Sequence, residues 1–297
     1  MGGLHSIQCQ HRVILTLRSS SSGAAARDQR GSAPLHEASQ WGHYDIAQFL
    51  IKYGAKAAAK DQYGSTPLHA ERVDFNIAQL LVGDGASTEV QDHRGRTPLH
   101  HASERGDLDL ARFLIENGAN TVAKDKRGST PLHQASSWGR LNVARLLVER
   151  GTDVAARDQF LSTPLHQVSE RGHLDLTRFL VEGGARVSAQ DQNGSTPLHG
   201  ASEHGHLNIA RLLVEHRADV SARDQDRAAP LHEASPNDHL DLIRFLLEND
   251  ADAAAQDQGG STPFDLASQR GQTDVAWFLT EHAAAQATPQ VQQSRAT

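Results

Sequence analysis

Cysteine is almost absent from this chain of 297 residues, in which Cys9 is the only copy. A single thiol excludes an intramolecular disulfide and a cluster of thiolate ligands for a metal ion. Apolar runs are short, and none approaches the roughly 20 residues of a membrane-spanning helix. Basic residues are outnumbered, since the formal net charge is −7. The chain therefore lacks the basic field of a general nucleic-acid-binding protein, and we expect no nucleic acid among its partners.

A repeated tetrapeptide dominates what the sequence does contain. Thr-Pro-Leu-His begins at Thr66, Thr97, Thr130, Thr163 and Thr196, and variants of it begin at Ala33, Ala229 and Thr262. From Thr97 onward the spacing is 33 residues. Self-similarity at this period predicts a stack of similar helical units around one continuous core, rather than a globule with a central cleft.

Residues 92–124 predict a turn, a short helix, a second turn and a second helix. Thr97 is typical of an N-cap, and Pro98 is typical of the first helical position. Gly106 should end this first helix. Leu110 to Ile115 then form an apolar stripe on the second helix. Neither helix can bury its apolar side alone, so each unit must stack on its neighbours.

The unit resembles the ankyrin repeat in its Asp-Gly turn, Thr-Pro-Leu-His, alanine-rich first helix, Gly-His and Leu-Leu pattern. The resemblance covers about Asp28 to Ala283. It implies an all-α ankyrin-repeat solenoid of about eight 33-residue turn-helix-turn-helix units, and protein binding rather than catalysis. We place the repeats at 28–60, 61–91, 92–124, 125–157, 158–190, 191–223, 224–256 and 257–283, after a disordered or partial capping segment at 1–27 and before a disordered tail at 284–297.

Two repeats depart from the pattern. Repeat two is two residues shorter than repeat one between its proline and the isoleucine of its second helix. This loss predicts a truncated first helix that packs poorly on repeats one and three. Repeat seven has Pro236 near the end of its first helix. Non-glycine residues also stand where glycine recurs elsewhere, at Leu161, Arg217, Arg227, Asp238 and Asp250.

Seven histidines belong to the tetrapeptide and raise the question of a metal site: His36, His69, His100, His133, His166, His199 and His232. Equivalent residues of successive repeats lie roughly 8–10 Å apart. Zinc needs nitrogens about 2.0–2.1 Å from one centre, so this row cannot share an ion. We expect these side chains to form hydrogen bonds between neighbouring turns, and we expect no bound metal.

Catalytic motifs are missing as well. The sequence has no phosphate-binding glycine loop with its lysine, no nucleophile elbow and no His-Glu-x-x-His helix. Turn aspartates such as Asp92 and Asp125 recur one repeat apart, too far for a general acid and base to act together. We therefore expect neither an enzyme nor a cofactor.

The positions that vary between repeats predict a binding surface. By the resemblance, partners dock on the turn tips and on the exposed end of the first helix. The partner-binding residues predicted there are Trp41, Tyr63, His93, Arg94, Arg96, Arg105, Lys126, Arg127, Trp138, Phe160 and Arg171. Six of these residues form a basic strip in repeats three and four. Exposed tryptophan, tyrosine and arginine dominate interface energetics, so we expect a protein partner with an acidic, partly apolar segment. Surface drift between duplicated repeats explains the same residues without a ligand.

The sequence favours a non-catalytic, monomeric scaffold for protein–protein interaction. The alternatives are a substrate-recruiting or inhibitory adaptor that acts with a separate effector chain, and an array without a fixed ligand. Gly2 fits a myristoylation pattern, and Cys9 could carry a second acyl chain. Residues 1–27 also resemble a mitochondrial targeting peptide, and a plain tail explains them equally well. We expect a cytoplasmic protein, with nuclear or membrane-peripheral placement as alternatives, and membrane contact only through acylation.

Overall fold

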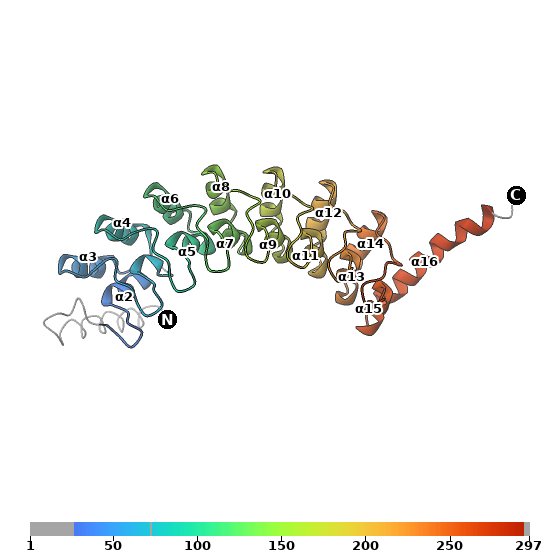
Figure 1. Ribbon diagram of the computed structural model, residues 1–297, viewed down its shortest axis with the longest axis horizontal. Coiled ribbons are helices and arrows are strands. Elements are labelled where there is room, and N and C mark those ends of the chain that lie inside the picture. Colours follow the sequence, from blue (N-terminus) through green and yellow to red (C-terminus); the bar gives the residue numbers. More distant parts are fainter. Residues whose placement is uncertain (1–26, 72, 294–297) are drawn as a thin grey trace. The chain divides into compact units, whose positions relative to one another are not determined.

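The computed structural model describes residues 27–71 and 73–293, with side chains to residue 284, and this part of the chain contains helices and turns without a β-strand (Figure 1). The expected all-α repeat architecture is confirmed. The chain divides into two units, one of residues 1–135 and 142–152, the other of residues 136–141 and 153–297. The border crosses the repeat that holds α7 (Pro131–Ser137) and α8 (Leu141–Glu149).

The first unit consists of helix pairs in two layers. Its first helices are α2 (Pro34–Gln40), the 3-10 helix η2 (Pro67–His69) and α5 (Pro98–Arg105), and its second helices are α3 (Tyr44–Lys52), α4 (Phe75–Gly83) and α6 (Leu108–Glu116). η2 packs between α2 and α5, while α4 packs between α3 and α6. First helices thus contact first helices, and second helices contact second helices.

The second unit repeats this arrangement. Its first helices are α9 (Pro164–Arg171), α11 (Pro197–Glu203), α13 (Pro230–Ala234) and α15 (Pro263–Gln269), and its second helices are α10 (Leu174–Glu182), α12 (Leu207–Glu215), α14 (Leu240–Glu248) and α16 (Thr273–Gln293). A 3-10 turn, η3 (Ser235–Asn237), follows α13 and contains Pro236. α11 packs between α9 and α13, and α12 between α10 and α14.

The tetrapeptide fixes both the start of each first helix and the core beneath it. In repeat three, Thr97 is the N-cap with an extended backbone (φ −88°, ψ 166°), Pro98 is the first helical residue, and α5 ends before Gly106 at φ 80°. These features confirm the helix that the sequence predicts. The leucine of the tetrapeptide has an exposed fraction of 0% in the first seven repeats, at Leu35, Leu68, Leu99, Leu132, Leu165, Leu198 and Leu231.

The histidine of the tetrapeptide links most repeats to the next, whereas the buried Nε2 of His232 has no hydrogen-bond partner among the described residues. His100 Nδ1 lies 3.1 Å from the Thr97 backbone nitrogen, and Nε2 lies 3.1 Å from the Ser129 carbonyl oxygen of repeat four. The amide can only donate and the carbonyl can only accept, so the ring is neutral with its proton on Nε2. The same two bonds form at His36, His69, His166 and His199. The predicted hydrogen bonding between neighbouring turns is confirmed.

Repeat eight shows why the bridging residue is histidine elsewhere. Asp265 takes its place and accepts hydrogen bonds from the Thr262 backbone nitrogen and hydroxyl, at 2.8 and 2.6 Å. An aspartate can satisfy the N-cap but cannot donate to a following turn. α16 follows α15 and continues as one helix to Gln293, so the described residues contain no ninth turn that would need a donor.

Repeat two has the predicted truncation. Its first helix is only η2, and the chain leaves the helical path at Ala70. Leu68 stays completely buried, so the core of this repeat is intact. The partly buried Arg105 of repeat three packs against the end of η2, where its Nη1 donates to the Ala70 carbonyl oxygen at 3.0 Å.

The five non-glycine residues at recurrent glycine positions all adopt positive φ. The angles are 59° at Leu161, 68° at Arg217, 58° at Arg227, 61° at Asp238 and 68° at Asp250. This conformation costs an L-residue roughly 1–2 kcal/mol. A Cβ at Gly95, which corresponds to Leu161, would lie 2.8 Å from the backbone nitrogen of Lys126 in the next turn. The turn keeps its shape because the stacked neighbours impose it.

The last helix continues beyond the last repeat. α16 extends to Gln293, whereas the sequence analysis begins a disordered tail at residue 284. Alanine and glutamine, which are frequent after residue 282, are good helix formers and favour the continuation, whereas Pro289 opposes it. Within the repeats, Val275 and Leu279 of α16 are buried.

The buried histidines predict a fall in stability on acidification. Burial lowers the pKa of His69 and of His100 to about 4, from 6.5. Between these values the unfolded chain binds protons that the folded chain excludes, so the free energy of unfolding should fall as pH falls from 6.5 towards 4. The steepest loss is about 1.4 kcal/mol per pH unit for each such histidine.

Urea unfolding between pH 4 and 8 would measure this loss, with His100→Gln as the comparison. The variant should be less stable at pH 7 by roughly 1–3 kcal/mol, because a buried hydrogen bond is lost. This difference should shrink towards pH 4. A constant difference across the range would contradict the assignment of a neutral bridging ring.

Leu161→Gly should stabilise the protein. Glycine removes the strain of positive φ, at an entropic cost of about 0.5–1 kcal/mol in the unfolded chain, so a net gain of about 0.5–1 kcal/mol is expected. Urea unfolding would measure it. Leu161→Ala is the matched control, since it shortens the side chain but keeps the strained backbone. An equal gain in both variants would assign the effect to the side chain instead.

Candidate functional site

The turn tips of the first unit form a row connected by backbone hydrogen bonds. The Gln62 N–H donates to the Arg30 carbonyl at 3.0 Å, the His93 N–H to the Tyr63 carbonyl at 2.7 Å, and the Lys126 N–H to the Arg94 carbonyl at 2.9 Å. Each tip is also braced by its own aspartate. Asp92 Oδ1, for example, accepts from the Arg94 and Arg96 N–H groups at 2.8 and 2.9 Å. The side chains on these tips are therefore presented from a fixed backbone.

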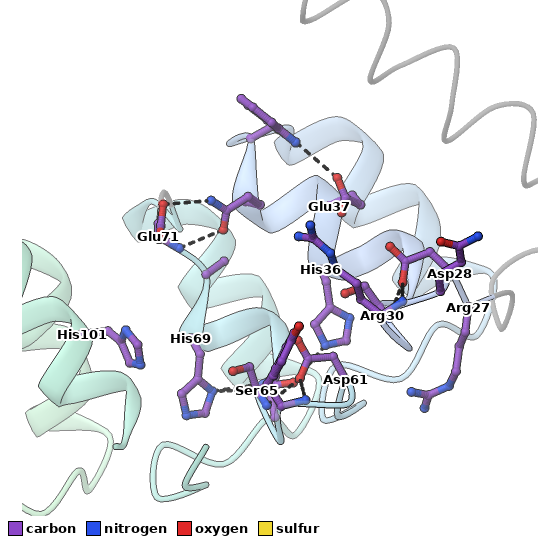
Figure 2. A pocket seen from close by; sticks show the side chains of 17 residues that line it. Arg27, Asp28, Arg30, His36, Glu37, Asp61, Ser65, His69, Glu71 and His101 are labelled. Carbon is purple, nitrogen blue, oxygen red and sulfur yellow. Dashed lines mark hydrogen bonds between the residues drawn. The ribbon is translucent and has the colours of Figure 1, made fainter. Parts of the chain in front are cut away.

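A hollow of about 1010 Å³ opens beside this row in repeats one and two (Figure 2). The turn tips with Arg30 and Tyr63 line one part of it, and α2 with Glu37 and Trp41 lines another. The hollow reaches Ala70, where the short η2 ends. Because a longer first helix would continue past this point, the truncation of repeat two gives the hollow its room.

Carboxylates outnumber arginines around the hollow. The acidic residues are Asp28, Glu37, Asp61 and Glu71, and the arginines are Arg27 and Arg30. Burial lowers the pKa of His36, and that of His69 to about 4, so both rings are neutral at pH 7. The lining therefore carries a net negative charge.

Neutral groups hold the two glutamates in place, as Figure 2 shows. Glu37 Oε2 accepts from the Trp41 indole N–H at 3.3 Å. Glu71 Oε2 accepts from the Gln40 side-chain amide at 3.4 Å, and Gln40 Oε1 accepts from the Glu71 backbone N–H at 3.0 Å. Hydrogen bonds from neutral donors orient a carboxylate without cancelling its charge.

His101 of repeat three closes one end of the lining. Its Nε2 lies 3.2 Å from Asp92 Oδ2, and its ring meets that of His69 edge-on at 5.6 Å. Burial alone would raise the pKa of Asp92, but the hydrogen bonds from His101, Arg96 and Arg94 hold it well below its usual range. Asp92 is therefore ionised and engaged within its own repeat.

The structure divides the predicted basic strip into two groups. His93, Arg94, Lys126 and Arg127 are exposed on the tips of repeats three and four, and we call these four residues the basic tips. Arg96 instead pairs with Glu104 at 2.9 Å, and Arg105 reaches the Ala70 carbonyl. The guanidinium groups of Arg96 and Arg105 therefore have partners within the chain, which the sequence spacing did not indicate.

The predicted aromatic residues are exposed as expected. Trp41 and Tyr63 line the hollow, with exposed fractions of 40% and 52%. Trp138 and Phe160 are exposed in the second unit, as is Arg171. Phe160 lies on a turn tip whose carbonyl accepts from the Gln192 N–H at 2.8 Å.

The acidic lining of the hollow was not predicted from the sequence. Glu37 and Glu71 were not among the predicted partner-binding residues, although the shortened repeat two marked their place. The hollow exists only once α2, η2 and α5 stack. Gly2 and Cys9, the predicted acylation sites, lie outside the described residues.

Repeat seven contains a carboxyl group, that of Glu233, whose pKa is shifted. Glu233 follows the tetrapeptide histidine of α13, the position that His101 occupies in α5. Burial, and then the charges of Glu203, Asp224 and Asp226, raise the pKa of Glu233 to about 7. Repeats four and five carry a neutral glutamine at the corresponding position.

Other kinds of site find no support in the described residues. Among residues 27–71 and 73–293, no group of three histidine, aspartate, glutamate or cysteine side chains is placed to hold a metal ion. In the same part of the chain, no helix combines the length and the hydropathy that crossing a bilayer requires.

Comparison with protein families gives two matches that together cover most of the chain. A family model described as "Ankyrin repeats (3 copies)" matches residues 6–70, 70–158 and 156–224. A second, described as "Ankyrin repeats (many copies)", matches residues 213–267. Ankyrin repeats are general protein–protein interaction modules. No curated protein matches the chain.

Glu233→Gln should stabilise the protein in alkaline solution. Because the folded pKa of about 7 exceeds the unfolded value of 4.5, the contribution of Glu233 to stability is complete below pH 4.5 and is lost as pH rises through 7. The neutral variant should be more stable at pH 8 by about 1–2 kcal/mol after allowance for solvent screening.

Urea unfolding at pH 5 and pH 8 would measure this difference, which should nearly vanish at pH 5. Glu248→Gln removes the same charge from the exposed face of α14 and serves as the control. An equal gain from both variants would show a general effect of net charge rather than repulsion at Glu233.

Proposed function

The chain belongs to the ankyrin repeat family, and we propose that it is a non-catalytic scaffold that binds a partner protein through its turn tips and its concave first-helix face. The observation that carries this proposal is the hydrogen-bonded row of tips, which holds exposed basic and aromatic side chains on a fixed backbone. Little ordering entropy is lost when a partner docks on such a surface, so more of the contact energy contributes to affinity.

The partner that fits this surface is a protein with an acidic, partly apolar segment. Its carboxylates would lie against the basic tips, whose side chains are exposed and make no ion pair among the described residues. Its apolar groups would lie against exposed rings such as those of Trp41 and Tyr63. Charge complementarity of this kind steers encounter and selects partners.

A substrate-recruiting or inhibitory adaptor would use the same surface and would differ only in the effector chain that it brings. We propose a monomeric protein, because the repeats bury their apolar residues on one another within each unit, and a cytoplasmic one, because a single cysteine suits a reducing compartment. The absence of an enzyme role is supported by the hollow itself. His36 and His69 serve as structural bridges, His101 is bonded to Asp92, and the two glutamates are bound by neutral donors.

Removing charge from the basic tips should weaken partner binding. The test variant is Arg94→Ala with Arg127→Ala, and the control is Arg112→Ala with Arg178→Ala, which removes the same charge from the exposed faces of α6 and α10. Partners would first be recovered with the intact chain, and the affinity of the main one would then be measured by calorimetry. We expect a loss of about tenfold or more in the test variant, which corresponds to about 1.4 kcal/mol.

The loss should be larger at low ionic strength, because salt screens exposed charges. The control should bind like the wild type. If both variants retained full affinity, or lost it equally, the tips would not be the docking surface.

A further inference from the structure

The hollow and the basic tips lie beside each other in the first unit but carry opposite charge. The hollow is lined mainly by carboxylates of repeats one and two, while the basic tips belong to repeats three and four. The same row of hydrogen-bonded turns carries both, since Tyr63 of the hollow accepts from His93 of the basic tips. A partner that crosses this row therefore meets a negative region and then a positive one.

Among the described residues no ion pair neutralises the two glutamates of the hollow, although the charge of Arg105 acts on Glu71 from repeat three. In the part of the chain that the structure describes, the carboxylates of Glu37 and Glu71 accept hydrogen bonds from the Trp41 indole and the Gln40 amide, which are neutral. None of the ion pairs in the part of the chain that the structure describes involves either glutamate. Arg27 also lines the hollow, but its Nη1 donates to the carbonyl oxygens of Gly31 and Lys60.

The shape and the rings of the hollow suit a long cationic side chain. Ala70 and the end of η2 leave space where a longer first helix would stand. Trp41 and Tyr63 expose their rings on the lining, and an arginine or lysine placed over such a ring gains about 0.5–2 kcal/mol. The Glu37 carboxylate, bonded to the Trp41 indole, is at hand to pair with the same cation.

The repeat spacing sets the distance between the two regions. Successive repeats lie roughly 8–10 Å apart, so the centre of the hollow and that of the basic tips are separated by about 16–20 Å. An extended peptide covers this distance with five or six residues, at about 3.3 Å each.

We propose that the hollow receives an arginine or lysine side chain of the partner segment, and that the acidic residues of the same segment, five or six positions away, lie on the basic tips. This inference rests on the proposed function and specifies the partner: a segment of two charge signs rather than a purely acidic one. The shortened repeat two is then the feature that selects the basic residue.

Selection from a phage-displayed library of random 16-residue peptides, with the full chain as bait, tests the proposal. Selected peptides should share a basic residue five or six positions from a pair of acidic residues. The best peptide would be synthesised, and its affinity measured for the wild type and for Glu37→Gln with Glu71→Gln. These isosteric changes keep the hydrogen bonds to Trp41 and Gln40 but remove two charges, and they should weaken binding tenfold or more.

Controls separate the hollow from general charge effects. Glu182→Gln with Glu215→Gln removes the same charge from the exposed faces of α10 and α12 and should leave the affinity unchanged. Thermal unfolding would establish that each variant is folded. Replacing the basic residue of the peptide by glutamine should weaken its binding to the wild type. The same replacement should change its affinity for Glu37→Gln with Glu71→Gln very little.

The outcomes distinguish this inference from the proposed function. Selected peptides that share no basic residue, or that bind Glu37→Gln with Glu71→Gln as tightly as the wild type, would overturn the inference. The scaffold role would still stand. A chain that selects no peptide would oppose the scaffold role, and the inference would fall with it.

Discussion

The buried histidine between successive turns is the interaction on which the rest of the structure depends. The His100 ring, like four others, accepts from the N-cap of its own helix and donates to a carbonyl of the next repeat, so one side chain fixes both a helix start and a stacking distance. The ring can do this only while neutral, and burial keeps it neutral by lowering its pKa. Where no further turn needs a donor, Asp265 suffices. The turn tips owe their fixed spacing, and therefore their use as a binding surface, to this bridge.

Irregularity in one repeat creates a feature that regular stacking would not. The loss of two residues reduces the first helix of repeat two to a single 3-10 turn and opens the hollow. Leu68 stays buried and Arg105 binds the Ala70 carbonyl, so the stack continues across the defect. The carboxylates that line the hollow make it negatively charged, whereas the basic tips one repeat further on are positively charged.

Much of this fold could be predicted because its determinants lie within one repeat. The positions of Thr97, Pro98 and Gly106 gave the limits of α5 correctly, and the missing glycine at Leu161 pointed to a strained turn that the structure contains. The exposed tips were also predictable, since they vary while the core does not. The partners of Arg96 and Arg105, and the acidic hollow, were not, because they depend on how α2, η2 and α5 meet.

The repeat, the limits of α5, the bridging histidines and the place of the defect could all be predicted from local sequence, because caps, turns and apolar stripes act over a few residues and recur every 33. The partners of the arginines, the position of the hollow and the charges that line it depend on how the repeats pack. Those properties arise between atoms that lie about one repeat apart in the chain, such as Arg105 Nη1 and the Ala70 carbonyl oxygen. A periodic pattern predicts that such residues are neighbours, but it does not predict which hydrogen bonds they form or which space remains between them.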